Sequence, residues 1–288
     1  MKRESNIVIV GLGLLGGSYA RGLSSAGFEK VYAIDTNPQA IAYAKQQGYI
    51  KDGKTQDFEP LLQQADYVIF AVYPTVLKQW VQQWGSLLKP GCLCTDVSGV
   101  KTGLVQWVQE NLPQQVEFIA SHPMAGKEVS GVQNCHLVNF APANFLITPT
   151  EKNTERGVSF ARTLANILGF AHIRVLSCQQ HDQMIAYVSQ LTHAIAVSLM
   201  CVPNAQQFAQ YTGDSFRDLT RIARINETMW AELFLWNKEY LVDEMDRFSG
   251  RLQQLRQYLI TDDRQGLEEM FRQSTAARTA FDQREGEA

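Results

Sequence analysis

The amino-acid sequence predicts an α/β protein in which a doubly wound parallel sheet is followed by an all-helical half. Three observations support this prediction. Short β-rich runs alternate with amphipathic segments over the first 177 residues, a glycine-rich turn follows the first run, and no further strand pattern appears after Ser177. Because 288 residues suffice for two ordinary domains, we expect one domain at residues 1–178 and a second at 179–288.

Seven runs in the first part have the pattern of buried strands. Their apolar residues occupy consecutive positions, which is typical of a parallel sheet covered on both faces. The runs are NIVIV (6–10), VYAID (31–35), YVIFAV (67–72), CLCTDV (92–97), FIAS (118–121), FLIT (145–148) and HIRVL (172–176).

A G-x-G-x-x-G motif, formed by Gly11, Gly13 and Gly16, connects the first strand to a helical segment. The first glycine permits a tight turn, the second lets a pyrophosphate approach the backbone, and the third lets helix and strand pack closely. The free amides at the helix N-terminus also favour phosphate. The motif therefore predicts a Rossmann-like dinucleotide site, the alternative being a glycine turn that binds nothing.

The second strand ends in Asp35, which follows Gly11 by 24 residues. A carboxylate there can accept hydrogen bonds from both ribose hydroxyls and would repel a 2′-phosphate, so we expect NAD rather than NADP. Ligands of open α/β sheets bind at the carboxyl ends of the strands. Val72 and Pro74, in the strand-end stretch AVYPT (71–75), are further cofactor-binding candidates, as is Leu15 within the glycine motif.

The stretch SHPMAG (121–126) places a histidine at the end of another strand. Pro123 biases His122 away from helical dihedrals and removes a backbone donor. A neutral imidazole can take a proton from an alcohol while a hydride leaves the carbon that bears it. We expect Ser98, in DVSG, to orient this imidazole by a hydrogen bond. A histidine that only satisfies a core or cap position is the alternative.

The remaining histidines give weaker signals. His136 and His172 are expected at the surface or at strand edges, and His181, followed by Asp182, is expected to cap a helix start. His193 lies within an apolar helical segment, where a polar group needs a reason, and is expected to line the cleft.

The helical half carries three arginines, Arg217, Arg221 and Arg224, within TGDSFRDLTRIARI (212–225). At helical spacing they would project from one face, where pairing with neighbouring carboxylates is the usual explanation. Arginine is also suited to bidentate binding of a carboxylate, so a carboxylate substrate is the second interpretation.

An apolar stripe predicts one long helix, packed on another, in the last third of the chain. Its residues are Trp230, Phe234, Leu241, Met245, Phe248, Leu252, Leu255 and Leu259. A half of this size cannot easily hide such a stripe, so we expect a homodimer that buries it.

The composition excludes several classes of protein. A net charge of −3 and a pI near 6.0 do not produce the positive electrostatic potential that attracts polyanions, so we expect no nucleic-acid partner. The apolar runs are strand-sized and the start lacks a signal-peptide core, so we expect no membrane partner. Five cysteines without a CxxC pair indicate a cytoplasmic protein with no metal site.

Taken in order, GLGLLGGS, DVSGVK, SHPMAG, HDQMIAYVSQLTHAIA, SFRDLTRIA and NETMW resemble the prephenate/arogenate dehydrogenase family of tyrosine biosynthesis over nearly the whole chain. The resemblance implies a dinucleotide-binding domain followed by a helical dimerisation domain. It also implies NAD-dependent oxidative decarboxylation of prephenate to 4-hydroxyphenylpyruvate, with arogenate to tyrosine as the alternative.

The same resemblance implies roles for single residues. His122 would bind and deprotonate the C4 hydroxyl of the substrate, and Ser98 would hydrogen-bond to His122 and to the substrate. Arg221 would pair with the ring carboxylate, Arg217 being the weaker candidate. The substrate pocket would be lined by Glu128, His193 and Trp230.

Two departures from the family pattern concern the substrate side chain. Where many relatives have SHLPH this chain has SQLTH, so that Gln190 replaces a histidine, and Lys127 stands before the glutamate in place of a small polar residue. Both are expected near the substrate side chain, so the preference between prephenate and arogenate is not predicted. A β-hydroxyacid dehydrogenase and a non-catalytic NAD-binding regulator are the remaining alternatives. The first lacks its lysine-bearing helix here, and the second would need neither His122 nor Ser98.

Overall fold

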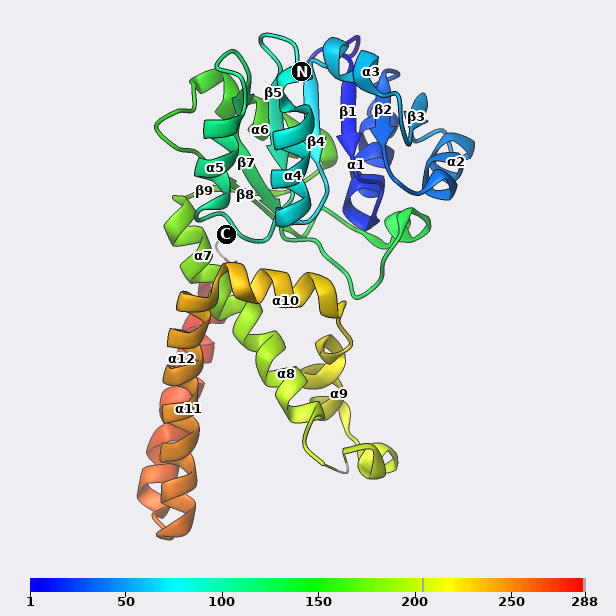
Figure 1. Ribbon diagram of the computed structural model, residues 1–288. Helices are drawn as coiled ribbons and strands as arrows, with labels where there is room; N and C mark the ends of the chain where they lie inside the picture. Colours follow the sequence, from blue (N-terminus) through cyan, green and yellow to red (C-terminus); the bar gives the residue numbers. More distant parts are fainter. Residues whose placement is uncertain (204, 287–288) are drawn as a thin grey trace.

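The computed structural model describes residues 1–203 and 205–286 and shows a sheet domain joined to a helical half with two projecting arms (Figure 1). The predicted fold class is confirmed. The six-stranded sheet is parallel throughout, in the order β3-β2-β1-β4-β5-β6 that is typical of dinucleotide-binding domains. Its strands are β1 (Ile7–Val10), β2 (Val31–Ile34), β3 (Asp52–Lys54), β4 (Tyr67–Phe70), β5 (Leu93–Asp96) and β6 (Glu117–Phe118).

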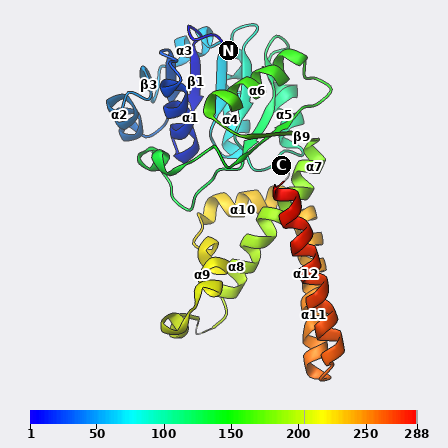
Figure 2. The same cartoon turned by 180° about the vertical axis from the view of Figure 1, so that it is seen from behind.

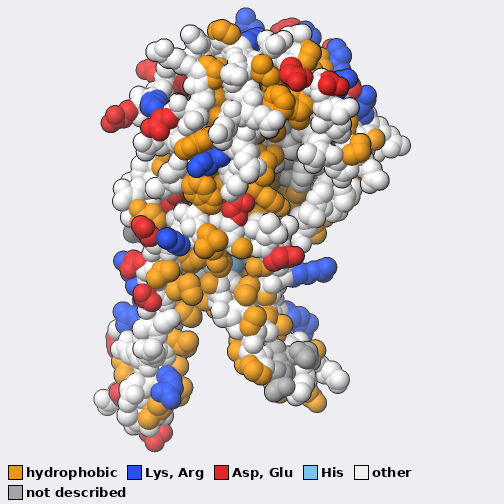
Figure 3. All heavy atoms as spheres, in the orientation of Figure 1, with side chains coloured by type: hydrophobic (Ala, Val, Ile, Leu, Met, Phe, Trp, Pro, Cys, Tyr) orange, Lys and Arg blue, Asp and Glu red, His pale blue; other side chains and the backbone are white. Residues whose placement is uncertain are grey.

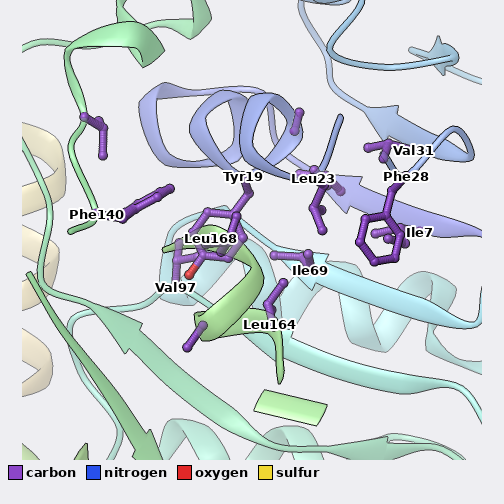
Figure 4. Close-up of a cluster of buried hydrophobic side chains, with 14 of the residues drawn as sticks. Ile7, Tyr19, Leu23, Phe28, Val31, Ile69, Val97, Phe140, Leu164 and Leu168 are labelled. Atoms are coloured by element: carbon purple, nitrogen blue, oxygen red, sulfur yellow. The ribbon is translucent and has the colours of Figure 1, made fainter. Parts of the chain in front are cut away.

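Helices cover both faces of this sheet, because alternate residues of each strand point to opposite sides. In β1, Ile7 and Ile9 pack into one cluster with α1 and α6, while Val8 and Val10 pack into another with α4 and α5. Figure 4 shows the first cluster, which includes Tyr19 and Leu23 of α1 and Leu164 and Leu168 of α6. The helices of this domain are α1 (Leu14–Ser25), α2 (Pro38–Gln46), α3 (Glu59–Gln64), α4 (Pro74–Trp84), α5 (Leu104–Asn111) and α6 (Glu155–Leu168).

Two details of the sheet differ from the prediction. The edge strand β3 was missed, because the sequence DGK carries no apolar or β-branched residue. The run FIAS is not one strand, since β6 pairs with β5 whereas β7 (Ala120–Pro123) belongs to a second sheet. In that sheet β7 is antiparallel to β8 (Asn144–Thr148), which is parallel to β9 (His172–Val175).

From Cys178 onward, the regular elements of the described residues are all helices. A capping box at Ser177 starts the first of these helices, and Ala186–Leu191 forms a π-helical turn between the first and the second. The helices are α7 (Cys178–Ile185), α8 (Thr192–Met200), α9 (Asp214–Thr220), α10 (Glu227–Trp236), α11 (Lys238–Ile260) and α12 (Arg264–Gly286). A domain division after residue 178 stays a prediction.

The apolar stripe does not form the single long helix that we expected. It is divided at Asn237, where α10 ends and α11 begins. Asn237 is buried, and its amide donates hydrogen bonds to the Asp182 carbonyl oxygen and to Gln190 Oε1. Beyond this corner α11 and α12 run side by side as one arm, while α8 and α9 form the other (Figure 2). Within the described parts of the chain, no helix combines the length and the apolar character needed to cross a bilayer.

Candidate active site

Gly11 and Gly13 flank Leu12 in the loop between β1 and α1, and together with Gly16 of α1 they form a glycine cradle. Gly11 has a φ of +94°, and a Cβ atom there would lie 2.5 Å from the Ala71 carbonyl oxygen. A Cβ atom on Gly16 would collide with the backbone of Gly11, whereas one on Gly13 would meet no described heavy atom within 4 Å. The loop is therefore closed toward the sheet and open at Gly13, as close approach of a pyrophosphate requires.

Asp35, just beyond the carboxyl end of β2, lies against this loop. Its Oδ2 accepts a hydrogen bond from the Leu12 amide at 2.5 Å, and its Oδ1 accepts one from the Asn37 amide at 2.7 Å. A pocket of about 470 Å³, whose lining includes Gly13, Asp35 and Gln133, opens beside the carboxylate. These residues fit the adenosine half of NAD, because a carboxylate in the pocket wall can accept hydrogen bonds from ribose hydroxyls.

The other cofactor-binding candidates lie in α1 and in the segment from β4 to α4. Val72 follows β4, and its Cγ1 atom lies 2.8 Å from the position of a Cβ atom on Gly11. Pro74 is the first residue of α4, and Leu15 lies half-buried in the first turn of α1. Their contact with a cofactor stays a prediction.

Helix α10 covers the strand ends that carry these loops. The Glu232 carboxylate accepts a hydrogen bond from the Thr75 amide at 2.6 Å, at the start of α4. Leu233 lies 3.8 Å from the position of a Cβ atom on Gly99, just beyond β5. The helical half therefore closes over the carboxyl edge of the sheet, as Figure 1 shows.

A fully buried ion pair supports the strand that carries the histidine. Lys101 Nζ donates to Asp96 Oδ2 at 2.6 Å and to the Ser121 carbonyl oxygen at 2.8 Å, and both charged side chains are 0% exposed. Asp96 also accepts hydrogen bonds from the amides of Ser98 and Ser121. The carboxylate thus joins the end of β5, the DVSG turn and β7, one residue before His122.

His122 lies within β7, opposite Leu146 of β8, and is half-buried. Its Nδ1 lies 2.9 Å from Nε2 of His181, and a Cβ atom on Gly99 would lie 3.7 Å from its Nε2 and Cε1. Burial, together with the nearby His181 and Lys101, holds the pKa of His122 well below its ordinary value of 6.5. The imidazole is therefore neutral at pH 7, as a general base must be.

The expected hydrogen bond between Ser98 and His122 is not formed. Ser98 Oγ is buried and has no hydrogen-bond partner in the part of the chain that the structure describes. Nδ1 of His122 is instead paired with Nε2 of His181. The expectation that His181 caps a helix start was wrong. The N-cap of α7 is Ser177, so that His181 falls on the buried face of the helix. The pattern S-x-x-Q from Ser177 to Gln180 was the signal that could have placed it.

A second group of side chains forms beside α8 and α10. Arg221 Nη1 lies 2.5 Å from Glu128 Oε1, which joins the helical half to the loop after β7. The ring of His193 stacks on Trp230 with a centroid separation of 3.7 Å, and its Nδ1 lies 2.8 Å from the Ser189 carbonyl oxygen. Burial lowers the pKa of His193. The structure therefore gathers four of the five expected substrate-binding residues into two pairs.

Arg217, the fifth, is exposed and donates to the Thr212 carbonyl oxygen at 2.8 Å. The expected common face of three arginines does not exist, because α9 ends at Thr220 and a 3₁₀ turn follows from Arg221. Gln190 is buried and donates to the Leu233 carbonyl oxygen, so it supports α10, and its position relative to a substrate side chain stays a prediction. Lys127 is exposed.

Two family models match the chain. The first, described as "Prephenate dehydrogenase, nucleotide-binding domain", matches residues 19–173. The second, described as "Prephenate dehydrogenase, dimerization domain", matches residues 177–273. Together they account for both halves of the molecule.

Individual proteins are similar over nearly the whole chain. The prephenate dehydrogenase of Bacillus subtilis is 29% identical, over 98% of this chain and 76% of the relative. The cyclohexadienyl dehydrogenase of Zymomonas mobilis is 26% identical, over 96% of each. A crystal structure of prephenate dehydrogenase from Aquifex aeolicus, in complex with hydroxyphenyl propionate and NAD+, matches with a TM-score of 0.86 and 28% identity, covering 96% of this chain and 98% of that chain.

Proposed function

This chain belongs to the prephenate dehydrogenase family, and on that premise we propose that it converts prephenate to 4-hydroxyphenylpyruvate by NAD-dependent oxidative decarboxylation in tyrosine biosynthesis. The observation that carries the proposal is the position of the His122 imidazole, which lies beside Gly99 of the DVSG turn, at the carboxyl edge of the sheet that also holds the glycine cradle. The two family models confirm, at the level of the family, the resemblance found in the sequence.

The proposed reaction requires a hydride transfer and two proton transfers. NAD would be held by the glycine cradle and Asp35, and it would supply the acceptor for the hydride that leaves C4 of the substrate ring. His122 takes the proton of the C4 hydroxyl as the carbonyl forms, and returns it to the same oxygen when loss of carbon dioxide makes the ring aromatic. Loss of the carboxylate needs no base, because the electrons of the broken carbon–carbon bond pass into the ring as carbon dioxide leaves. A single neutral imidazole therefore meets the whole demand for proton transfer.

Arg221 is the group that we propose to bind the ring carboxylate. In the structure its guanidinium is paired with Glu128, so a bound carboxylate would replace or join that partner. A charge-assisted hydrogen bond of this kind is directional and fixes the orientation of the ring. His193 and Trp230, stacked on each other, form an aromatic wall that we assign to the same pocket.

We expect Arg221→Gln to raise the KM for prephenate by about 10- to 100-fold, the equivalent of one hydrogen bond to a charged group. The kcat should change less, because His122 keeps its surroundings. Arg217→Gln is the matched control, since that arginine contacts only its own segment in the described structure. An unchanged KM in Arg221→Gln would assign the carboxylate to another residue.

The function is tested by incubating the purified protein with NAD and either prephenate or arogenate and following absorbance at 340 nm. We expect turnover with prephenate. Arogenate is the second candidate substrate, because a relative that covers 96% of this chain is a cyclohexadienyl dehydrogenase. Turnover of arogenate alone would replace the proposed substrate, and turnover of neither would refute the proposed function.

We propose that the helical half forms a homodimer. Large hydrophobic side chains are exposed on both arms (Figure 3), among them Met245, Leu252 and Leu259 of α11, which belong to the predicted stripe. Such a surface is rarely left open to water. Sedimentation equilibrium at micromolar concentration should give twice the chain mass of 32.4 kDa, and a stable monomer would contradict the proposal. Five free cysteines support a cytoplasmic location, which we also propose.

A further inference from the structure

A chain of three side chains leads from helix α7 to the ring of His122. Asp182 Oδ1 lies 2.7 Å from Nδ1 of His181, and Nε2 of His181 lies 2.9 Å from Nδ1 of His122. His181 is 0% exposed and Asp182 is 1% exposed, so neither exchanges its partner for water. The ionisation state of Asp182 decides which nitrogen of His181, and then of His122, carries the proton.

Asp182 is an ionised acceptor. Its Oδ1 also accepts a hydrogen bond from the Lys101 amide at 2.9 Å, and its Oδ2 accepts one from the Thr102 amide at 2.6 Å. Burial alone would raise the pKa of Asp182, but the donors His181 and Thr102 outweigh it and hold the pKa below the ordinary value. An ionised carboxylate can only accept hydrogen bonds, so the His181 nitrogen that lies 2.7 Å from it presents Nδ1–H.

The position of the proton on the His181 ring determines which nitrogen of His122 is protonated. Burial lowers the pKa of His181 in spite of Asp182, so its ring is neutral and carries one N–H only. With that proton on Nδ1, its Nε2 is an acceptor, and His122 must donate from Nδ1–H. The lone pair of His122 then lies on Nε2, the nitrogen that faces Gly99.

We propose that Asp182 and His181 are positioning residues, which hold His122 in the tautomer whose Nε2 is free to accept the proton of the substrate hydroxyl. The inference rests on the proposed function for that substrate. It differs from a serine-protease triad in that a second imidazole stands between the carboxylate and the base. Once His122 has taken up the proton, Nε2 of His181 still accepts the hydrogen bond from Nδ1–H of the imidazolium.

The proposal is tested by two replacements of His181. Leucine has no acceptor, so His122 loses the partner that selects its tautomer. Glutamine offers an amide oxygen that can accept from Nδ1–H of His122. We expect His181→Leu to lower kcat by between about 10-fold and 10⁴-fold, the upper figure being the loss known when a triad aspartate is replaced. His181→Gln should recover at least about 10-fold of that loss, with unchanged NAD affinity in both variants.

The tautomer is measured directly by ¹⁵N NMR of histidine-labelled protein, with the signal of His122 assigned by its absence in His122→Asn. In the wild type we expect Nδ1 to be protonated and Nε2 to be unprotonated at pH 7. A proton on Nε2, or equal kcat values for the leucine and glutamine variants, would overturn the proposal. If the leucine variant fails to fold, the wild-type spectrum still decides. Absence of turnover with both substrates would refute the function alone, because the spectrum needs no substrate.

Discussion

Replacement of His122 by asparagine is expected to lower kcat by about 10²- to 10⁴-fold, the usual contribution of a positioned general base. Asparagine is smaller, and its amide can still donate to Nε2 of His181, but it cannot accept a proton at neutral pH. NAD affinity should stay within about twofold, because the glycine cradle and Asp35 lie on other loops. Stopped assays with prephenate and a fluorescence titration with NAD measure the two effects.

The pH dependence of the wild type belongs to the same experiment. Only neutral His122 can act as the base, so activity is lost as the pH falls through its pKa. Burial, His181 and Lys101 lower that pKa, so the acid limb of kcat/KM should lie below pH 6.5. An acid limb above pH 6.5, or a parallel loss of NAD binding in His122→Asn, would show that this histidine has a structural role.

The parts of the fold that follow from local patterns were predicted from the sequence. Consecutive apolar residues identified β1, β2, β4 and β5, because those strands are buried on both faces. The edge strand β3 has no such pattern, since one side of it meets solvent. The break between α10 and α11 was also invisible, because Asn237 has a helical neighbourhood and is fixed only by contacts with Asp182 and Gln190.

The candidate site shows the same division between local and long-range information. The glycine cradle and His122 were found because their residue types are unusual at strand ends. The role of His181 was missed because its partner, His122, is 59 positions away in the chain. The S-x-x-Q capping pattern before it indicates only its place on the helix. Spacing along one segment cannot reveal that Nδ1 of His122 is occupied, and this is why Ser98 was assigned a bond that the structure does not form.

The second large effect concerns the stability of the strand that bears His122. Lys101→Met should lower the free energy of unfolding by about 3–5 kcal/mol, because it leaves the carboxylate of Asp96 buried without its charged partner. The remaining donors to Asp96 are the amides of Ser98 and Ser121, which carry no net charge. Urea unfolding followed by circular dichroism measures the loss.

Lys89→Met is the matched control for this argument. Lys89 Nζ lies 2.5 Å from Asp66 Oδ1, about as close as the buried pair, but its side chain is 34% exposed. Exposed pairs contribute about 0–1 kcal/mol because water solvates whichever partner remains. Burial is therefore what separates the two variants, and equal losses would contradict it. Asp96→Asn combined with Lys101→Met should recover part of the loss, since the double variant leaves no buried charge uncompensated.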